Sequence, residues 1–206
     1  MKCIIGKKLG MTTLFDEEKG ALNVTLIACE KNTVTANRTL EKDGYIALQV
    51  ETKKTAKKTV RKAAKKTVRK AKKSDRSVDA KTHATELETF PVASDLSVTQ
   101  FVVGDKVNVS GVTKSKGFQG VVKRHGFGGQ MTSHGRKHDI RKPGSIGATF
   151  PEHVVKGRRM AGRMGGENMT ALNLSVVYVN EAEGLIGVRG AVPGVNGRVV
   201  KVMGVN

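Results

Sequence analysis

The sequence predicts a mainly β protein, built as a small closed β-barrel with two basic insertions, one of them a long extended arm. Short runs of β-branched and apolar residues occur near both ends of the chain and in its middle, a pattern typical of strands. Two segments between these runs are crowded with Lys and Arg. The 206 residues carry a formal net charge of +19, so the compact chain would repel itself without a polyanionic partner.

The first 112 residues hold four runs with the composition of strands, each near glycine or charged turn residues: 22–27, 45–50, 97–103 and 106–112. Gly104-Asp105 separates the last two runs and is typical of a hairpin turn. We therefore expect 97–103 and 106–112 to be two strands of one hairpin.

Three further runs near the C-terminus repeat the pattern: 172–179, 185–188 and 198–202. In the first of them, every second residue from Leu172 to Tyr178 is apolar. Successive side chains of a strand point to opposite faces, so this alternation predicts one buried face.

The strand-bearing pieces, about 1–50, 86–113 and 170–206, together have the size of one domain. Strand runs at both chain ends indicate that residues 1–206 form a single domain. The basic segments 51–85 and 114–165 are then insertions in it. Many short antiparallel strands favour closure into a barrel, because closure removes exposed sheet edges.

The first insertion contains an internal repeat: the sequence KKTVRKA of residues 57–63 recurs at 65–71. Its basic pairs are spaced by four, which places them near one another on a helix. Twelve like charges between Glu51 and Asp75 oppose helix formation in free solution. We expect the segment to be disordered or frayed alone and helical once a polyanion neutralises it. The alternative is a solvated charge run without specific contacts.

The second insertion is basic without being repetitive. Residues 114–163 hold twelve Lys and Arg but only two acids, Asp139 and Glu152. Frequent glycines let its backbone turn sharply and approach a surface closely, and its arginines offer planar forks for phosphate. With six Phe, two Tyr and no Trp in the chain, we expect contacts to phosphate, sugar and groove shape more than base stacking. The arm therefore points to structured nucleic acid.

Other classes of protein fit the sequence poorly. A surface-bound membrane protein would need an apolar stretch beside its charges, and the N-terminal apolar run is too short for a signal peptide, so we expect a cytoplasmic protein. Cys3 and Cys29 lie apart in apolar contexts, which predicts buried free thiols.

Two short motifs raise the question of catalysis or metal binding. Gly128-Gly129-Gln130 matches the tripeptide that peptide release factors use to orient a water, but it is short and lies in a glycine-rich chain. His134 and His138 have the spacing of two zinc ligands on a helix, but Gly135 lies between them and no third ligand is visible. No phosphate-binding glycine loop occurs. We expect no enzyme activity, no metal and no cofactor.

Five blocks, in order along the chain, resemble the ribosomal protein L3 family of the large subunit, bacterial type: 6–12 (GKKLGMT), 115–124 (SKGFQGVVKR), 142–147 (KPGSIG), 156–165 (KGRRMAGRMG) and 190–194 (GAVPG). The resemblance spans nearly the whole chain. Ala148-Thr149-Phe150 stands where some members of the family carry a methylated Gln, so that modification is not carried over. The repeat of the first insertion matches no motif of the family.

The resemblance implies a barrel like the β domains of translation factors and an arm that enters ribosomal RNA (rRNA) toward the peptidyl transferase centre. It also implies a role early in assembly of the large subunit. Residues 145–147 would lie near the tip of the arm, and Arg158, Arg159 and Arg163 on its returning side.

We therefore predict a structural, rRNA-binding constituent of the large ribosomal subunit, with large-subunit rRNA and neighbouring ribosomal proteins as partners and no membrane or small-molecule substrate. The alternative is a nucleoid or histone-like DNA-binding protein. Nineteen residues are predicted to contact rRNA: Lys7, Lys8, Lys114, Lys116, Lys123, Arg124, His125, His134, Arg136, Lys137, Arg141, Lys142, Ser145, Ile146, Gly147, Lys156, Arg158, Arg159 and Arg163.

Overall fold

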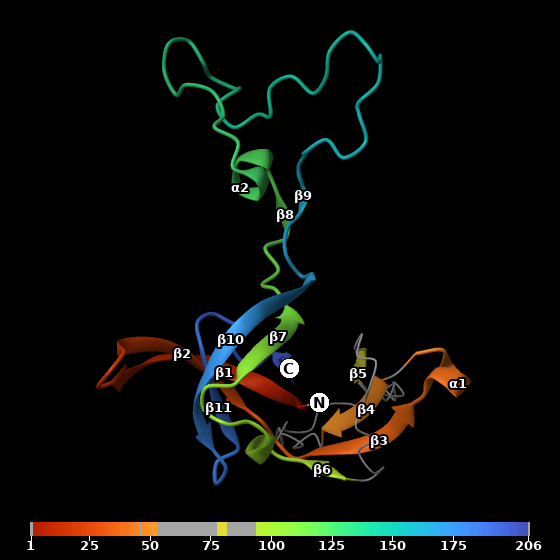
Figure 1. Cartoon of the computed structure of the whole chain (residues 1–206). Helices are drawn as coiled ribbons and strands as arrows, with labels where there is room; N and C mark the ends of the chain where they lie inside the picture. The colour runs from red at the N-terminus through yellow and green to blue at the C-terminus, as the bar shows by residue number, and fades with distance from the viewer. Residues whose placement is uncertain (1, 46, 53–77, 82–93, 206) are drawn as a thin grey trace, which may run out of the picture. The chain divides into compact units, whose positions relative to one another are not determined.

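The computed structural model describes residues 2–45, 47–52, 78–81 and 94–205. The predictions for the repeat at 57–71 lie outside these residues. The chain divides into two compact units, which are described separately. Unit 1 comprises Met1–Gly111 and Met169–Asn206, and unit 2 comprises Val112–Asn168. The described residues are mainly strands (Figure 1), which confirms the predicted mainly β class.

The larger sheet of unit 1 contains six strands: β1 (Cys3–Asp16), β2 (Gly20–Ala28), β7 (Lys106–Val112), β10 (Asn168–Asn180), β11 (Leu185–Arg189) and β12 (Val199–Gly204). Their order is β1-β12-β7-β10-β11-β2. Because β1 pairs with both β12 and β2, the order returns to its first strand. We call this sheet the six-stranded ring.

The interior of the ring is filled by aliphatic side chains that are fully buried, among them Ile4, Ile27, Val107 and Val202. Removing such side chains from water is the main force that stabilises the unit. Gly6 lies where β1 packs against β2, and a Cβ there would be 2.5 Å from the Ile27 Cγ2. Only glycine fits so close to β2. Packing therefore explains why Gly6 stands in the first block of the family resemblance, residues 6–12.

The second sheet of unit 1 contains β3 (Asn32–Arg38), β4 (Ala47–Thr52), β5 (Val78–Lys81) and β6 (Asp95–Leu96), in the order β5-β4-β3-β6, with a short helix α1 (Leu40–Asp43) between β3 and β4. Residues 47–50 of the run predicted at 45–50 therefore lie in this sheet and not in the ring. Ile4 packs in the core of the ring, whereas Ile5 packs with Val34 and Leu48 in the core of the second sheet. Because side chains alternate along a strand, β1 serves both cores.

The strand predicted at 97–103 is wrong. The segment forms a 3-10 turn, η1 (Val98–Gln100), and then an irregular stretch up to β7. Val98 and Phe101 are both buried in the core of the ring, and their spacing of three suits one helical turn better than a strand. The neighbours of β7 are accordingly β12 and β10.

The buried face predicted from Leu172 to Tyr178 is only partly correct. Leu174 and Val176 pack in the core, but Leu172 is 64% exposed and Tyr178 37%. Asn173 has a φ of 55°, which interrupts the extended backbone after Leu172. A register shift between Val176 and Tyr178 changes the alternation again, because a bulge adds one residue. Val179 thereby packs on the core in place of Tyr178.

Cys3 and Cys29 are buried and free, as predicted. Burial raises the pKa of the Cys29 thiol to about 12, since a thiolate would lose its hydration there. At neutral pH this side chain is a small hydrophobic group.

Candidate nucleic-acid interface

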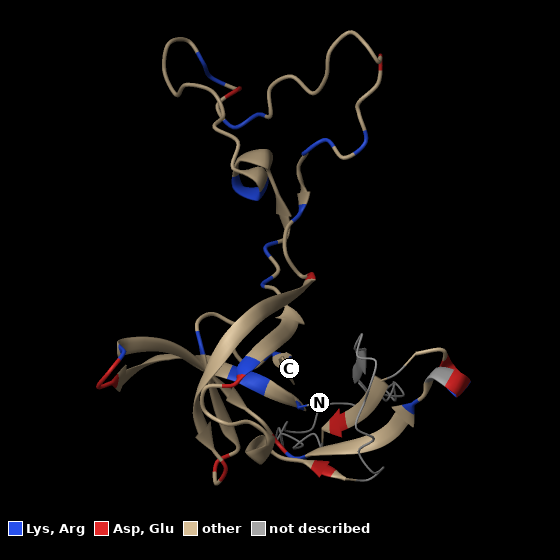
Figure 2. Cartoon of the chain, viewed as in Figure 1, with Lys and Arg blue, Asp and Glu red and all other residues tan. Residues whose placement is uncertain are grey.

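The positive charge of the chain is unevenly distributed. The described residues of unit 1 include twelve Lys and Arg and twelve Asp and Glu, so their formal charges cancel. Unit 2 has twelve Lys and Arg against three acids, Asp139, Glu152 and Glu167. Figure 2 shows basic residues on both the outgoing and the returning stretch of unit 2. Among the described residues, the excess positive charge therefore belongs to unit 2.

The base of unit 2 is held together by its own backbone. β8 (Phe118–Gln119) pairs with β9 (Gly162–Arg163). The Lys116 N–H donates to the Met164 carbonyl, and the Met164 N–H donates to the Gly117 carbonyl, both at 2.9 Å. These bonds give the two stretches a fixed register. The base of unit 2 is therefore shaped by contacts within the chain.

Gly165 closes this base and has no room for a side chain. Its φ is 74°, and a Cβ would meet the Lys114 carbonyl oxygen at a prohibitive distance. We expect Gly165→Ala to separate the two stretches and to lower hydrogen-exchange protection of the Lys116 and Met164 amides by about tenfold or more, because left-handed strain of roughly 1–2 kcal/mol adds to the clash.

Gly157→Ala is the matched control for that substitution. Gly157 has a similar φ of 84° but open space around it. Gly157→Ala should therefore leave the hydrogen-exchange protection of the Lys116 and Met164 amides unchanged. Equal effects of the two substitutions would show that backbone strain, and not the close approach at Gly165, decides the result.

A short helix, α2 (Val121–His125), holds the returning stretch through one carbonyl group. The Arg124 Nη1 donates to the Met160 carbonyl at 2.7 Å, and the His125 Nε2 lies 3.0 Å from the same oxygen. The Arg124 guanidinium lies directly against Gly162, where a Cβ would be 2.7 Å from the Nη1. Gly126 ends the helix with a φ of 73°, and its N–H donates to the Val122 carbonyl.

The long loop of unit 2 has local ties of its own. The Gln130 N–H donates to the Ile140 carbonyl at 3.0 Å, and a Cβ at Gly129 would clash with that carbonyl oxygen. The second glycine of the Gly128-Gly129-Gln130 motif therefore has a packing reason. His134 has a φ of 59°, so it is not in a right-handed helix. No group of three potential metal ligands occurs in the ranges that the structure describes.

Three of the twelve cations of unit 2 are engaged within the protein. Arg124 donates to Met160, Arg158 Nη2 donates to the Ser145 carbonyl at 2.8 Å, and Lys142 Nζ pairs with Asp139 at 2.8 Å. The hydrogen bond from Lys142 lowers the pKa of the Asp139 carboxyl. Arg124, Arg158 and Lys142, which the sequence predicts to contact rRNA, therefore also shape the loop.

The side chains of the other nine cations make no hydrogen bond or ion pair with the described part of the chain, and all nine residues are exposed: Lys114, Lys116, Lys123, Arg136, Lys137, Arg141, Lys156, Arg159 and Arg163. Unpaired cations at this density repel one another. The surface of unit 2 is therefore suited to a polyanion.

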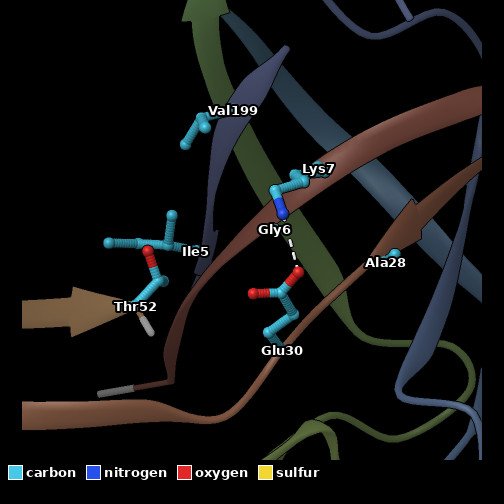
Figure 3. Close-up of a pocket in the computed structure, with 7 residues that line it drawn as sticks. All are labelled: Ile5, Gly6, Lys7, Ala28, Glu30, Thr52 and Val199. Carbon is cyan, nitrogen blue, oxygen red and sulfur yellow. Dashed lines mark hydrogen bonds and ion pairs between the residues drawn. The ribbon is translucent and has the colours of Figure 1, made fainter. Parts of the chain in front are cut away.

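Lys7 and Lys8 are consecutive but have different surroundings. Figure 3 shows Lys7 at a small, mostly apolar pocket of unit 1, where its Nζ pairs with Glu30 at 2.6 Å. Lys8 is 7% exposed. Its Nζ donates to the carbonyls of Val192 and Gly194 at 2.8 and 3.3 Å. Lys8 thus binds the segment 190–194, the last of the five blocks that resemble the family, from inside the protein.

We expect Lys8→Met to lower the free energy of unfolding by about 1–3 kcal/mol, because two carbonyls lose a buried donor. Lys7→Met removes the same charge but only a partly exposed ion pair, which contributes about 0–1 kcal/mol. Urea unfolding of the two variants checks this. A cost for Lys7→Met equal to that of Lys8→Met would contradict the structural role assigned to the Lys8 ammonium.

Sequence reasoning missed the exposed aromatic side chains of unit 2. Phe118 is 77% exposed and Phe150 is 79% exposed. Composition alone suggested few platforms for stacking, but an aromatic residue inside a basic, glycine-rich segment was a usable signal. Sequence reasoning also missed the Met160 carbonyl as the partner of Arg124 and His125, because backbone groups leave no mark in a side-chain pattern.

Fold and surface together define a class: a mainly β protein with a strongly cationic unit suited to a polyanion. No helix in the described ranges is long and apolar enough to cross a membrane.

Comparison with known proteins names the family. The ribosomal protein L3 family matches residues 29–187. The large ribosomal subunit protein uL3 of Leifsonia xyli subsp. xyli is 45% identical over 206 residues, covering 97% of this chain and 92% of the relative. The protein of the same name from Chlorobium limicola is 40% identical over 207 residues, covering 100% and 99%. The chain belongs to the ribosomal protein L3 family. Membership confirms the predicted resemblance and the prediction of a structural protein, not an enzyme.

Proposed function

We propose that this chain is a structural constituent of the large ribosomal subunit, in the cytoplasm, and that unit 2 binds large-subunit rRNA. It supports early assembly of the subunit and buttresses the region near the peptidyl transferase centre, with neighbouring ribosomal proteins as further partners. Membership of the family and the names of the relatives support the ribosomal assignment.

The observation that carries RNA binding is the set of nine exposed cations of unit 2 without an internal partner. Each Lys or Arg that neutralises a phosphate releases condensed counterions, which drives association. The described part of unit 1, whose charges cancel, lacks this driving force. Glycines in the loop allow the backbone itself to approach RNA closely.

The proposed interface differs from the sequence prediction in three respects. Lys8 is left out, because its ammonium group is buried on carbonyl oxygens. Arg124, Arg158 and Lys142 first shape the loop, and they contact RNA only with the N–H donors that these internal bonds leave unused. Phe118 and Phe150 are added, because an exposed ring offers a base a surface for stacking. The other residues predicted from the sequence remain in the proposed interface.

For the architecture, we propose that the six-stranded ring is a closed barrel of the translation-factor type within a single domain, residues 1–206. The order of strands, which returns to β1, supports closure. Residues 51–85 and 114–165 are then insertions in this domain.

The alternative of a nucleoid protein is less favoured, because a smooth duplex offers no deep channel for a loop of this length.

Binding to purified 23S-type rRNA fragments in competition with duplex DNA of equal length tests the proposal. We expect the folded rRNA to win by at least about tenfold, and the chain to remain with large subunits during sedimentation at high salt. Equal affinity for the two nucleic acids, together with release from subunits, would favour the nucleoid alternative.

A further inference from the structure

The hairpin of β1 and β2 extends beyond the strands that flank it in the ring. β12 pairs with β1 only as far as Lys7, and β11 pairs with β2 only from Val24 onward. Residues 14–16 and 20–22 pair with each other but with no third strand in the described part of the chain. Figure 1 shows this end of the hairpin reaching past the neighbouring strands. We call residues 13–22 the hairpin tip. A two-stranded ribbon is marginally stable in water unless something packs on it.

Phe15 is the most conspicuous side chain of the hairpin tip. It is 85% exposed, more than any other large apolar residue described. It lies opposite Ala21 across the hairpin. The next pair, Leu14 and Leu22, points to the other face, where Leu22 is buried. Phe15 therefore contributes nothing to the core, and the fold leaves its ring free for a contact.

The turn beside Phe15 is acidic. Asp16, Glu17 and Glu18 follow it directly, with Lys19 as the only cation of the turn. None of the three carboxylates makes an ion pair with the rest of the described chain. Phe118 in unit 2, by contrast, lies two residues from Lys116. Two exposed aromatic rings thus have surroundings of opposite charge.

We propose that the hairpin tip is a docking site for a basic segment of another protein of the large subunit. The Phe15 ring would pack on apolar side chains or the aliphatic stems of Lys and Arg, and the three carboxylates would pair with cationic groups of that segment. Phosphates of rRNA would be repelled by these carboxylates. The inference rests on the proposed place of this chain in the ribosome.

Photo-crosslinking from position 15 tests this docking site. The chain with p-benzoylphenylalanine at Phe15 is incorporated into large subunits, which are purified, irradiated and analysed by peptide mass spectrometry. We expect one protein adduct at a Lys- or Arg-rich segment. The same crosslinker at Val102, 61% exposed and in unit 1, should not label that segment. An adduct with rRNA, with an acidic segment, or no adduct would overturn the proposal.

Charge reversal adds an independent readout. In the crosslinking chain, E17K with E18K should reduce the yield of the protein adduct by about fivefold or more. E181K with E183K changes the charge equally at the exposed turn between β10 and β11 and should leave the yield unchanged. Equal losses would overturn the assigned electrostatic role.

Incorporation into subunits is scored separately. A chain that never co-sediments with large subunits refutes the proposed ribosomal function. An incorporated chain without the adduct refutes only the docking site.

Discussion

Replacing Arg136, Arg141, Arg159 and Arg163 with glutamine is expected to lower the affinity for large-subunit rRNA by roughly 10³-fold at 0.1 M salt. All four side chains are exposed and make no hydrogen bond or ion pair with the described part of the chain. Each lost phosphate contact removes about 0.7–0.9 from the slope of log K against log salt. The slope of the variant should therefore be shallower by about 3 to 4, as measured by filter binding across a salt titration.

The matched control removes the same charge from unit 1. Lys19, Lys31, Lys42 and Lys106 are exposed, and their replacement with glutamine should change the slope by less than about 1. Two results would contradict an interface centred on unit 2. One is a similar loss in both variants, which would mean that net charge alone drives binding. The other is a nearly flat titration of the unchanged protein.

Deleting residues 127–151 is expected to leave unit 1 folded but to stall maturation of the large subunit or to slow peptidyl transfer. The described hydrophobic cores draw no side chain from this range, so the melting temperature of unit 1 should shift by only about 2–3 °C. The base of unit 2, held by β8, β9 and α2, also lies outside the deletion. Calorimetry and sucrose-gradient profiles measure the two halves of this prediction.

A second variant separates contact from length. Residues 127–151 are replaced by a Gly/Ser segment of the same number of residues, which restores the span but none of the cations. If the side chains of the loop make the functional contacts, this variant should fail as the deletion does. Recovery of mature, active subunits would show that only the connection is needed. Loss of cooperative melting in the deletion would show that the loop belongs to the core.

Much of the strand content could be predicted from local patterns, but the pairing of strands could not. The runs at 22–27, 106–112 and 185–188 are strands because β-branched residues favour extended backbone. The composition of the run at 45–50 does not indicate that its residues 47–50 join a second sheet, since that depends on Ile5 facing the second core. The bulge after Val176 is likewise a product of tertiary packing.

For the candidate site, residue types predicted the partner, while position decided the roles. Two lysines that look equivalent in the sequence have different partners: Lys7 pairs with a partly buried carboxylate, whereas Lys8 donates to buried carbonyls. The glycines of unit 2 suggested close approach to a surface, but Gly162 and Gly165 are required by neighbours within the chain. Such roles depend on residues far apart in sequence.

The sequence by itself determined the chemistry of this protein: its excess of cations, where they cluster along the chain, and the family blocks in their order. These are properties of the residues in any conformation. Only the tertiary structure decided which cations remain free for a partner, which are bound to carbonyls, and that the Phe15 ring lies exposed on the hairpin tip. Those outcomes arise from contacts between distant segments, which form only when the chain has folded.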